Sequence, residues 1–485
     1  MSRSIKKNFI FNLINTVSVL VFPLITFPYA SRILLADGMG QVQFYHSIIS
    51  YIILLTSIGI PLYGIREVAR VRDDKEKLSK TTLELFFLSF LFSLVGYIIV
   101  AILCLTVGKV QDNIPLFLII SSSIFLTSIG CPWFYSGVEE FKYVTCLNIV
   151  VKIASVIFLF IFVKTKADLL LYGVYSVLGS IGNYLVNFIR LRKYISFKGI
   201  SLKSLQLFRH VKPAAAVFLL NIITSIYINL DTVMLGFLSG TTAVGYYNGA
   251  TKLSHLLVTL VTSLGTVLLP RTSNLLENGK NEEFYALSSK SYNFITMMSF
   301  PMLCGVLLLT PSIIMLFCGP GFIPSIEVLR IISPIIVFIG ISNLIGIQML
   351  YPMGKIKLVT ISTGVGAAVN LILNIILIPS MAQNGAALAT VIAEFSVMAT
   401  QVIFARNLIH IPLLSKKTLL YFAASLLMMF ICYLVMKVID KDYLKVIIVP
   451  VVGFLAYGGL MVVFRDEMTI SILAQLRNKL SRSEG

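Results

Sequence analysis

The sequence predicts an all-α polytopic membrane protein with about 14 transmembrane helices, and three observations lead to that fold class. Hydrophobic residues make up 57% of the 485 residues and charged residues only 12%. The mean hydropathy of +0.93 lies far outside the range of soluble globular domains. Fourteen stretches also have the roughly 20 mostly apolar residues that a helix needs to cross the hydrocarbon core of a bilayer.

The fourteen predicted spans follow one another along the whole chain. Their outward connections are all short, whereas two inward connections, residues 190–212 and 271–291, are longer. In chain order the spans cover residues 9–32, 42–65, 82–107, 114–136, 143–163, 168–189, 213–237, 243–269, 292–317, 326–350, 357–378, 385–408, 418–436 and 444–464.

The basic residues predict the orientation of the chain. With the N-terminus placed inside, 29 of the 39 Lys and Arg residues fall in inward segments, 7 in outward connections and 3 within spans. Because basic residues concentrate on the cytoplasmic side of membrane proteins, both termini are expected in the cytoplasm. The net charge of +18 is then explained by these loops, which also favour anionic lipid headgroups, so no nucleic-acid partner is expected.

The longer inward connections predict how the spans are grouped. Residues 190–212 alternate apolar and basic side chains, which predicts an interfacial amphipathic helix at the midpoint of a twelve-span unit. The segments LADGMGQVQFYHS and LSGTTAVGYYNGA place similar residues at the starts of spans 2 and 8, which favours two parallel six-helix repeats. The predicted domains are an N-terminal lobe at 1–190, a linker at 191–212, a C-terminal lobe at 213–410, and accessory helices 13 and 14 with a cytoplasmic tail at 411–485.

Several classes of site are excluded by the sequence. The six cysteines lie in or beside spans and form no C-x-x-C pair, so neither a metal centre nor a disulfide framework is expected. No Gly-Lys pair belongs to a G-x-x-x-x-G-K-[ST] motif, which excludes nucleotide binding by that route.

Polar side chains recur at helical spacing within several predicted spans. In span 8, Asn248, Lys252 and His255 share one stripe, because offsets of three and four residues return to the same helix face. Span 5 repeats the pattern with Asn148 and Lys152, and spans 1, 6 and 11 carry Asn and Ser or Thr stripes. Such residues either hydrogen-bond between packed helices or line a functional cavity. A lysine near the membrane centre favours the second reading, since it offers a point charge to an anionic ligand such as phosphate.

Two carboxylates also fall within predicted spans. Asp231 in span 7 and Glu394 in span 12 are candidates for coupling transport to Na⁺ or H⁺. Asn370 and Asn374 in span 11 would add oxygen ligands suited to Na⁺. The alternative is that both carboxylates pair with Lys252 or Lys152 and neutralise one another.

Span 1 carries two prolines, Pro23 and Pro28, which interrupt the hydrogen bonds of its helix. Membrane helices tolerate such breaks where side chains, water or a cavity satisfy the freed carbonyls, so this segment is predicted to be a hinge. Arg32 then closes the span at its outer end, and Arg66 follows span 2 at the inner end. Both are candidate contacts for an anionic substrate, although Arg66 also fits a purely topological role.

The sequence resembles the polysaccharide flippases of the multidrug, oligosaccharidyl-lipid and polysaccharide exporter superfamily. The resemblance rests on NFIFNLINTVSVLVFPLITFPYASRIL, GMGQVQFY, GIPLYGIREVARVRDD and NLDTVMLGFLSGTTAVGYYNGATKL, and it extends over essentially the whole chain.

The resemblance implies a function and a mechanism. Such proteins move undecaprenyl-pyrophosphate-linked oligosaccharide repeat units of O-antigen or capsule from the inner to the outer leaflet of a bacterial cytoplasmic membrane. Two six-helix lobes rock about a cationic cavity, and spans 13 and 14 form an apolar accessory pair. By position, Asp231, Asn370, Asn374 and Thr390 fall where some lipid II flippases bind sodium. No enzymatic activity and no cofactor are expected, and polysaccharide polymerase and chain-length proteins are expected partners of a monomeric transporter.

Three alternatives stay open from the sequence. A cation-coupled antiporter of drugs or organic cations would have twelve spans and acidic cavity walls. A lipid II flippase would carry a peptidoglycan precursor instead. A membrane-embedded polysaccharide polymerase would need a large outward loop with catalytic carboxylates, and no outward connection is long enough.

Overall fold

The computed structural model describes residues 5–196, 204–408, 413–471 and 474. These residues form helices and their connections, and no strand occurs among them. The chain divides into two compact units, Met1–Gly245 and Tyr246–Gly485. The all-α fold class predicted from composition is therefore confirmed.

The first unit is built mostly from long apolar helices. Its 53-residue helix α1 (Ile5–Ser57) is interrupted at Leu35, whose φ of 57° lies outside the helical region. A straight helix of that length would measure about 80 Å, more than twice the hydrocarbon thickness, so α1 comprises two arms. The other helices are α2 (Ile60–Val71), α3 (Lys75–Thr106), α4 (Gly108–Gln111), α5 (Ile114–Gly130), α6 (Pro132–Gly137), α7 (Phe141–Phe162), α8 (Leu169–Ile181), α9 (Asn183–Leu191) and α10 (Val211–Ser239), with short 3₁₀ turns at Lys166–Asp168 and Leu207–His210.

Local sequence explains where several of these helices begin and end. Asp74 caps α3 by accepting the backbone N–H groups of Glu76 and Lys77, and this bonding lowers the pKa of its carboxyl. Between α1 and α2, Gly59 adopts a φ of 73°, which an L side chain rarely takes, and the helix direction changes by 43°. The span predicted at 42–65 is therefore bent at this glycine and continues as α2.

The second arm of α1 crosses the start of α11 (Thr241–Glu277) at two glycines. A Cβ on Gly40 would lie 1.8 Å from the carbonyl oxygen of Thr241, and one on Gly245 would lie 1.9 Å from that of Ala36. The two backbones thus touch directly, as small residues allow in membrane proteins. Asp37 holds the same crossing by accepting the hydroxyl of Thr241 at 2.6 Å. These contacts join the two segments with similar sequences, LADGMGQVQFYHS and LSGTTAVGYYNGA.

The second unit holds most of α11 and six further helices. They are α12 (Asn281–Phe317), α13 (Ser325–Ile332), α14 (Ile335–Asn343), α15 (Ile356–Ala405), α16 (Lys416–Val438) and α17 (Asp442–Val463), with a 3₁₀ turn at Pro320–Phe322 and a π-helical segment at Leu344–Leu350. Helix α15 is interrupted at Ala382, where φ is 47°. A Cβ on Gly366 would lie 2.2 Å from Val397, so the two arms of α15 pack side by side.

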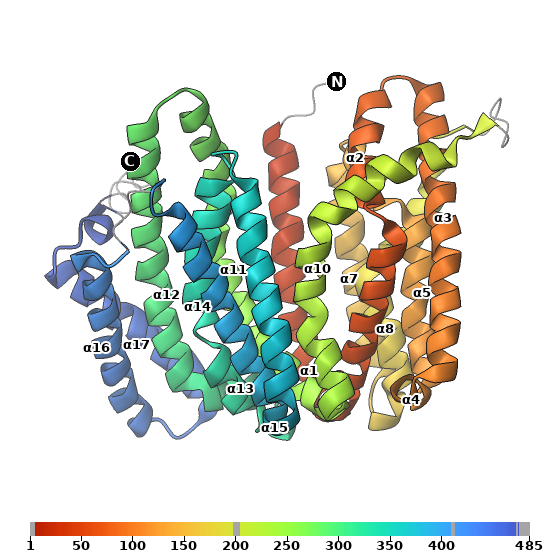
Figure 1. Ribbon diagram of the computed structural model, residues 1–485. Helices are drawn as coiled ribbons and strands as arrows, with labels where there is room; N and C mark the ends of the chain where they lie inside the picture. Colours follow the sequence, from red (N-terminus) through yellow and green to blue (C-terminus); the bar gives the residue numbers. More distant parts are fainter. Residues whose placement is uncertain (1–4, 197–203, 409–412, 472–473, 475–485) are drawn as a thin grey trace, which may run out of the picture. The chain divides into compact units, whose positions relative to one another are not determined.

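Helices α16 and α17 pack against each other and against α12 (Figure 1). A buried cluster joins the three helices through Cys304, Tyr421, Met428, Val449 and Met461. Their outer faces expose large apolar side chains, as expected for an accessory pair that borders lipid: Leu419, Phe430, Phe454, Leu455 and Val463.

Within the described residues, nine helices are long and apolar enough to cross a membrane, and eleven do so if each bent pair is one span. The interrupted helices α1 and α15 make this number compatible with fourteen, which stays a prediction, as do the predicted domain limits. The interfacial helix predicted at 190–212 falls partly on residues 197–203, outside the described part. The described part of that connection comprises the end of α9, a turn, the 3₁₀ helix Leu207–His210 and the start of α10.

Candidate functional site

The proline-containing arm of α1 has polar groups beside each break. Thr26 donates its hydroxyl to the carbonyl of Phe22 at 3.1 Å, and Arg32 donates to the carbonyl of Pro28 at 2.5 Å. Arg32 is exposed beyond the second proline. In the same arm, the hydroxyl of Tyr29 donates to the carbonyl of Val163 at the end of α7, at 2.8 Å. The arm is therefore anchored to α7, and Thr26 and Arg32 bond to carbonyls of their own helix.

Replacing Pro28 with Ala tests the hinge predicted for this arm. Alanine restores a backbone N–H and removes the ring, so α1 should straighten and stiffen. We expect slower transport by a several-fold factor with unchanged insertion, measured as flipping rate and as protein amount in membranes. An unchanged flipping rate would rule out the hinge; Pro450→Ala in α17 is the matched control, since that helix belongs to the accessory pair.

The polar stripes of spans 5 and 6 face one another in the first unit and line a common pocket of about 190 Å³. Helix α7 contributes Asn148 and Lys152, and the bent pair α8 and α9 contributes Ser180, Asn183 and Asn187. The pair bends by 49° between the two helices, where Gly182 lies. Asn183 and Asn187 are buried, with exposed fractions of 8% and 1%. The sequence left open whether these stripes hydrogen-bond between packed helices or line a cavity. In the structure they line a cavity.

Lys152 carries the charge of this pocket. Its ammonium group lies 5.7 Å from the centroid of the Phe22 ring, one residue before the first proline of α1. Among described residues Lys152 has no ion-pair partner. Neighbouring hydroxyls bond within their own helices: Ser155 donates to the Lys152 carbonyl and Ser180 to the Ser176 carbonyl. Pairing of Lys152 with a buried carboxylate, the neutralising alternative, is not seen in the described part of the chain.

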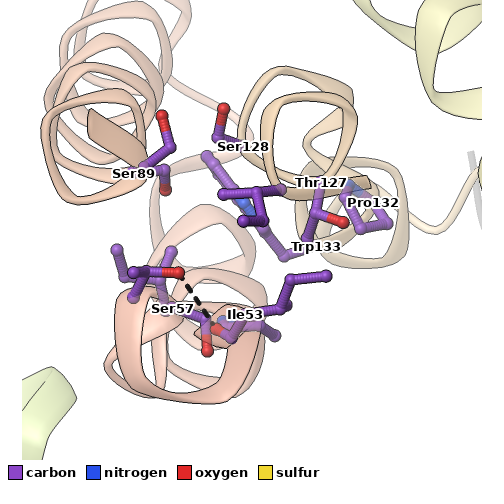
Figure 2. Close-up of a pocket in the computed structure, with 12 residues that line it drawn as sticks. Ile53, Ser57, Ser89, Thr127, Ser128, Pro132 and Trp133 are labelled. Atoms are coloured by element: carbon purple, nitrogen blue, oxygen red, sulfur yellow. Dashed lines mark hydrogen bonds between the residues drawn. The ribbon is translucent and has the colours of Figure 1, made fainter. Parts of the chain in front are cut away.

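A second, smaller pocket of about 40 Å³ is lined by residues of α1, α2, α3, α5 and α6 in the same unit (Figure 2). It is lined by Ile53, Ser57, Ser89, Thr127, Ser128 and Trp133, among others. Ser57, Ser89 and Ser128 all donate to carbonyls of their own helices, at 3.1, 2.9 and 2.8 Å. With these three serine hydroxyls satisfied and room for only a few waters, it lacks the features of a ligand site.

The stripe of span 8 lies on α11 and mostly in the second unit. Asn248 and Lys252 are half-buried, whereas His255 is exposed. Directly beside them, Cys318 lies 4.0 Å from the carbonyl of Gly249. The hydroxyl of Thr259 donates to the His255 carbonyl at 2.7 Å, so this end of the stripe bonds within its own helix. Lys252 therefore shares its helix face with the half-buried Asn248 and the exposed His255.

The candidate cation ligands divide between the two units. Asp231 lies on α10 in the first unit and is 7% exposed. In the second unit, Asn374 donates to the side-chain oxygen of Asn370 at 3.1 Å, and both are fully buried in the first arm of α15. Thr390 in the second arm bonds the Tyr247 hydroxyl at 3.0 Å, and Glu394 is half-buried one turn further on. No group of three or more His, Cys, Asp or Glu with metal-binding geometry occurs among the described residues.

Arg66 lies on α2, with 61% of its side chain exposed, and pairs with its neighbour Glu67 at 3.2 Å. It also lies over the ring of Tyr63 at 5.4 Å. The arginine is thus held at the surface by local contacts.

One buried polar network was missed by the sequence analysis. Glu84 in α3 is fully buried and accepts hydrogen bonds from Arg209 at 2.5 Å and from the backbone N–H of Gln206 at 2.9 Å. It also bonds His210 at 2.9 Å, whose other ring nitrogen meets the Tyr63 hydroxyl at 2.8 Å. The network joins α2, α3 and the segment that enters α10. The rule that singled out Asp231 and Glu394, a carboxylate within a span, applies equally to Glu84.

Comparisons with known proteins give one family and several relatives. The family model described as polysaccharide biosynthesis protein matches residues 5–276. The chain is 25% identical to a putative O-antigen transporter of Escherichia coli (strain K12) over 407 residues, 83% of this chain and 97% of that protein. It is 27% identical to a putative O-antigen transporter of Shigella dysenteriae, covering 73% of this chain and 87% of the other.

Solved structures share the fold. A lipid II flippase, MurJ, in an inward closed conformation matches with a TM-score of 0.72 at 17% identity, covering 95% of this chain and all of that one. An inward-facing multidrug resistance transporter of the MATE family matches with a TM-score of 0.60 at 12% identity, over 81% of this chain and 97% of that one. The chain therefore has the fold of these multi-pass transporters, as its resemblance to the superfamily predicted.

Proposed function

Because the chain belongs to the polysaccharide biosynthesis protein family, we propose that it is a flippase for lipid-linked oligosaccharides. It would move repeat units on an undecaprenyl-pyrophosphate carrier from the inner to the outer leaflet, for assembly of O-antigen or capsule. The observation that carries the proposal is the sequence match to putative O-antigen transporters, which extends over 83% of this chain and 97% of the E. coli protein.

The alternatives have weaker support. The lipid II flippase and the multidrug transporter match at 17% and 12% identity, a level at which only the fold is shared. Their substrates therefore give no reason to prefer peptidoglycan precursors or drugs. A polymerase is disfavoured because the relatives found are transporters rather than catalysts.

The charged residues of the spans fit an anionic substrate. A pyrophosphate group needs cationic donors within the membrane, where an ammonium group is costly unless it faces a wet cavity or a ligand. Lys252, flanked by Asn248 and His255 on α11, would bind this group. Arg32 and Arg66, both exposed, would meet it at the outer and inner ends of its path.

Energy coupling and cellular context complete the proposal. Asp231 and Glu394 would bind the coupling cation or proton, with the Asn370 and Asn374 pair supplying neutral oxygen ligands. The distribution of basic loops supports cytoplasmic termini, and the likeness to putative O-antigen transporters supports a place in the bacterial inner membrane. There the protein would act as a monomer, beside polysaccharide polymerase and chain-length proteins.

Replacement of Lys252 with Ala tests the proposed substrate contact. We expect at least a tenfold loss of flipping, because the variant loses a charge-assisted interaction with pyrophosphate, while Lys252→Arg keeps the charge and a measurable rate. The measurement is outer-leaflet exposure of the lipid-linked oligosaccharide in spheroplasts, labelled with an impermeant glycan-oxidising reagent.

Two controls make this measurement decisive. Cells without the protein give the background, and Lys437→Ala at the end of α16 controls for loss of a helix-borne lysine. Labelling that is equal with and without the protein would refute the flippase proposal. Full labelling with Lys252→Ala would refute the role of Lys252 alone.

A further inference from the structure

The end of α9 carries an arginine that aromatic side chains hold in place. The Arg190 guanidinium lies over the Tyr143 ring of α7, 3.7 Å from its centroid, and donates to the Tyr194 hydroxyl at 3.2 Å. Stacking of this kind fixes the plane of the guanidinium and leaves its in-plane donors available for an oxyanion. The arginine is therefore positioned before any ligand arrives, which lowers the entropic cost of binding.

Most of the hydrogen-bonding capacity of Arg190 is unused within the described residues. A guanidinium group has several N–H donors in one plane and no acceptor. One donor bonds Tyr194, and the Nε donor is buried without an acceptor. No described residue accepts from the other donors or forms an ion pair with Arg190. By contrast, Arg72 at the end of α2 pairs with Glu139 at 2.6 Å. The half-buried Arg190 can therefore take an anion without losing a carboxylate partner.

The position of Arg190 in the sequence places it at the depth of lipid headgroups. It directly follows the predicted span 168–189, and Tyr143 begins the predicted span 143–163. With the basic loops inside, both residues lie where the headgroups of the inner leaflet begin. Lys142 and Lys193 lie within three residues of this pair in the sequence, and both are exposed. Such a basic group favours an anionic headgroup over a zwitterionic one, whose ammonium group it repels.

Exposed apolar stripes lead from this basic group into the membrane. On α7, Tyr143, Cys146 and Val150 share one face at offsets of three and four residues, and Val150 is 61% exposed. On α9, Val186 lies one turn before Arg190 and is 40% exposed. In a bilayer these side chains contact acyl chains. The two stripes meet where Arg190 contacts Tyr143, so a headgroup at the arginine has apolar faces beside it for its chains.

We infer that one anionic phospholipid of the inner leaflet binds here, with its phosphate on the Arg190 guanidinium and its acyl chains along the exposed faces of α7 and α9. The inference does not depend on which substrate the protein transports. Because the bound lipid contacts both helices, it holds α9 against α7 beyond the bend that separates α8 from α9.

Glu140 is the acidic group beside this site. Its carboxylate lies within electrostatic range of Arg190. The same carboxylate repels a lipid phosphate held by the arginine. Removal of the Glu140 charge should therefore strengthen lipid binding, which is opposite in sign to the effect of removing the Arg190 charge.

The test is a lipid titration of the purified full-length protein in phosphatidylcholine nanodiscs that contain increasing amounts of phosphatidylglycerol. Trp133 is the single tryptophan of the chain and is 4% exposed, so its fluorescence reports unfolding. A lipid that binds the folded state raises the melting temperature in a saturable way. Titrations at high ionic strength screen the diffuse attraction of the basic loops and leave the direct contact. A further titration adds undecaprenyl phosphate as a competitor.

We expect phosphatidylglycerol to raise the melting temperature of the wild-type protein at low and at high ionic strength. Arg190→Gln should lower the apparent affinity about tenfold, because a charge-assisted hydrogen bond to the phosphate is lost. Arg192→Gln is the matched control, since Arg192 is exposed and has no ring or ion-pair contact among the described residues; its effect should vanish at high ionic strength. Glu140→Gln should raise the affinity. Tyr143→Leu removes the stacking but no charge and should also lower the affinity, which guards against an Arg190 variant that fails to fold.

Three results would overturn the inference. A wild-type melting temperature that does not respond to phosphatidylglycerol, or rises without saturation, would show that no lipid site exists. Equal losses of affinity for Arg190→Gln and Arg192→Gln at high ionic strength would reduce the effect to diffuse surface charge. Displacement of phosphatidylglycerol by far lower concentrations of undecaprenyl phosphate would make Arg190 a contact for the substrate carrier. Because the titration measures no transport, an Arg190-dependent shift would stand even if the flipping assay refuted the proposed function.

Discussion

Replacing Gly40 with Ala is expected to prevent the chain from reaching its stable folded state. The added Cβ would lie 1.8 Å from the Thr241 carbonyl oxygen and 2.6 Å from the Gly245 nitrogen, both backbone atoms that cannot rotate away. Overpacking against side chains alone costs about 1–3 kcal/mol, and here two helices must separate instead. The loss should appear as a melting temperature lowered by many degrees, or as absence of a monodisperse peak in size-exclusion chromatography.

A second substitution and a control make this prediction specific. Gly245→Ala meets the Ala36 carbonyl oxygen at 1.9 Å from the opposite side of the same crossing and should behave alike. Gly305→Ala in α12 is the matched control, because no atom lies within 4 Å of its added Cβ. It should be neutral or slightly stabilising, since alanine favours a helix more than glycine does. Equal melting of Gly40→Ala and Gly305→Ala would contradict the close crossing.

Replacing Glu84 with Ala should cause the second large loss of stability. The substitution leaves the buried His210 ring and the N–H of Gln206 without their acceptor, and Arg209 without its carboxylate. Breaking a buried ion pair from one side costs about 3–5 kcal/mol. Because the Arg209 side chain is 46% exposed, the lower end of that range is expected. The measurement is again the melting temperature, followed by Trp133 fluorescence.

An exposed ion pair provides the comparison for Glu84. Glu283 pairs with Lys280 at 2.8 Å while more than half of each side chain is exposed, so Glu283→Ala should cost less than about 1 kcal/mol. Glu84→Gln should fall between the two, as it keeps an acceptor oxygen but loses the charge. If Glu84→Ala and Glu283→Ala melt alike, the network does not hold α10 to α2 and α3.

Sequence periodicity predicted the main features of the Lys152 pocket. It placed Asn148 with Lys152 on one helix face and Asn183 with Asn187 on another, because residues three or four apart share a face. The periodicity could not decide whether those two faces hydrogen-bond to each other or enclose a cavity. That depends on the bend between α8 and α9 and on serine hydroxyls that bond to their own helices, neither of which has a pattern in the sequence.

The Glu84 network shows why some residues escape such reasoning. Glu84 is the third residue of the predicted span 82–107, but its type and position in the sequence do not show which groups it meets. Its partners Arg209 and His210 lie more than a hundred residues away, within a loop whose polar residues look solvated. Only the packing of that loop against α3 buries the carboxylate.

The amino-acid sequence by itself determined the all-α membrane class and the membership in a transporter superfamily. The membrane class follows from apolar length, because a backbone that spans a bilayer must satisfy its own hydrogen bonds and therefore forms helices. The superfamily follows from the resemblance of particular motifs. The breaks at Leu35 and Ala382 fall in connections that the sequence predicted, at 33–41 and 379–384. Tertiary structure alone decided the break at Gly59 and which distant segments touch. Those features depend on steric fit between backbones far apart in the chain, as at Gly40 and Gly245, and such fit leaves no periodic signal to read.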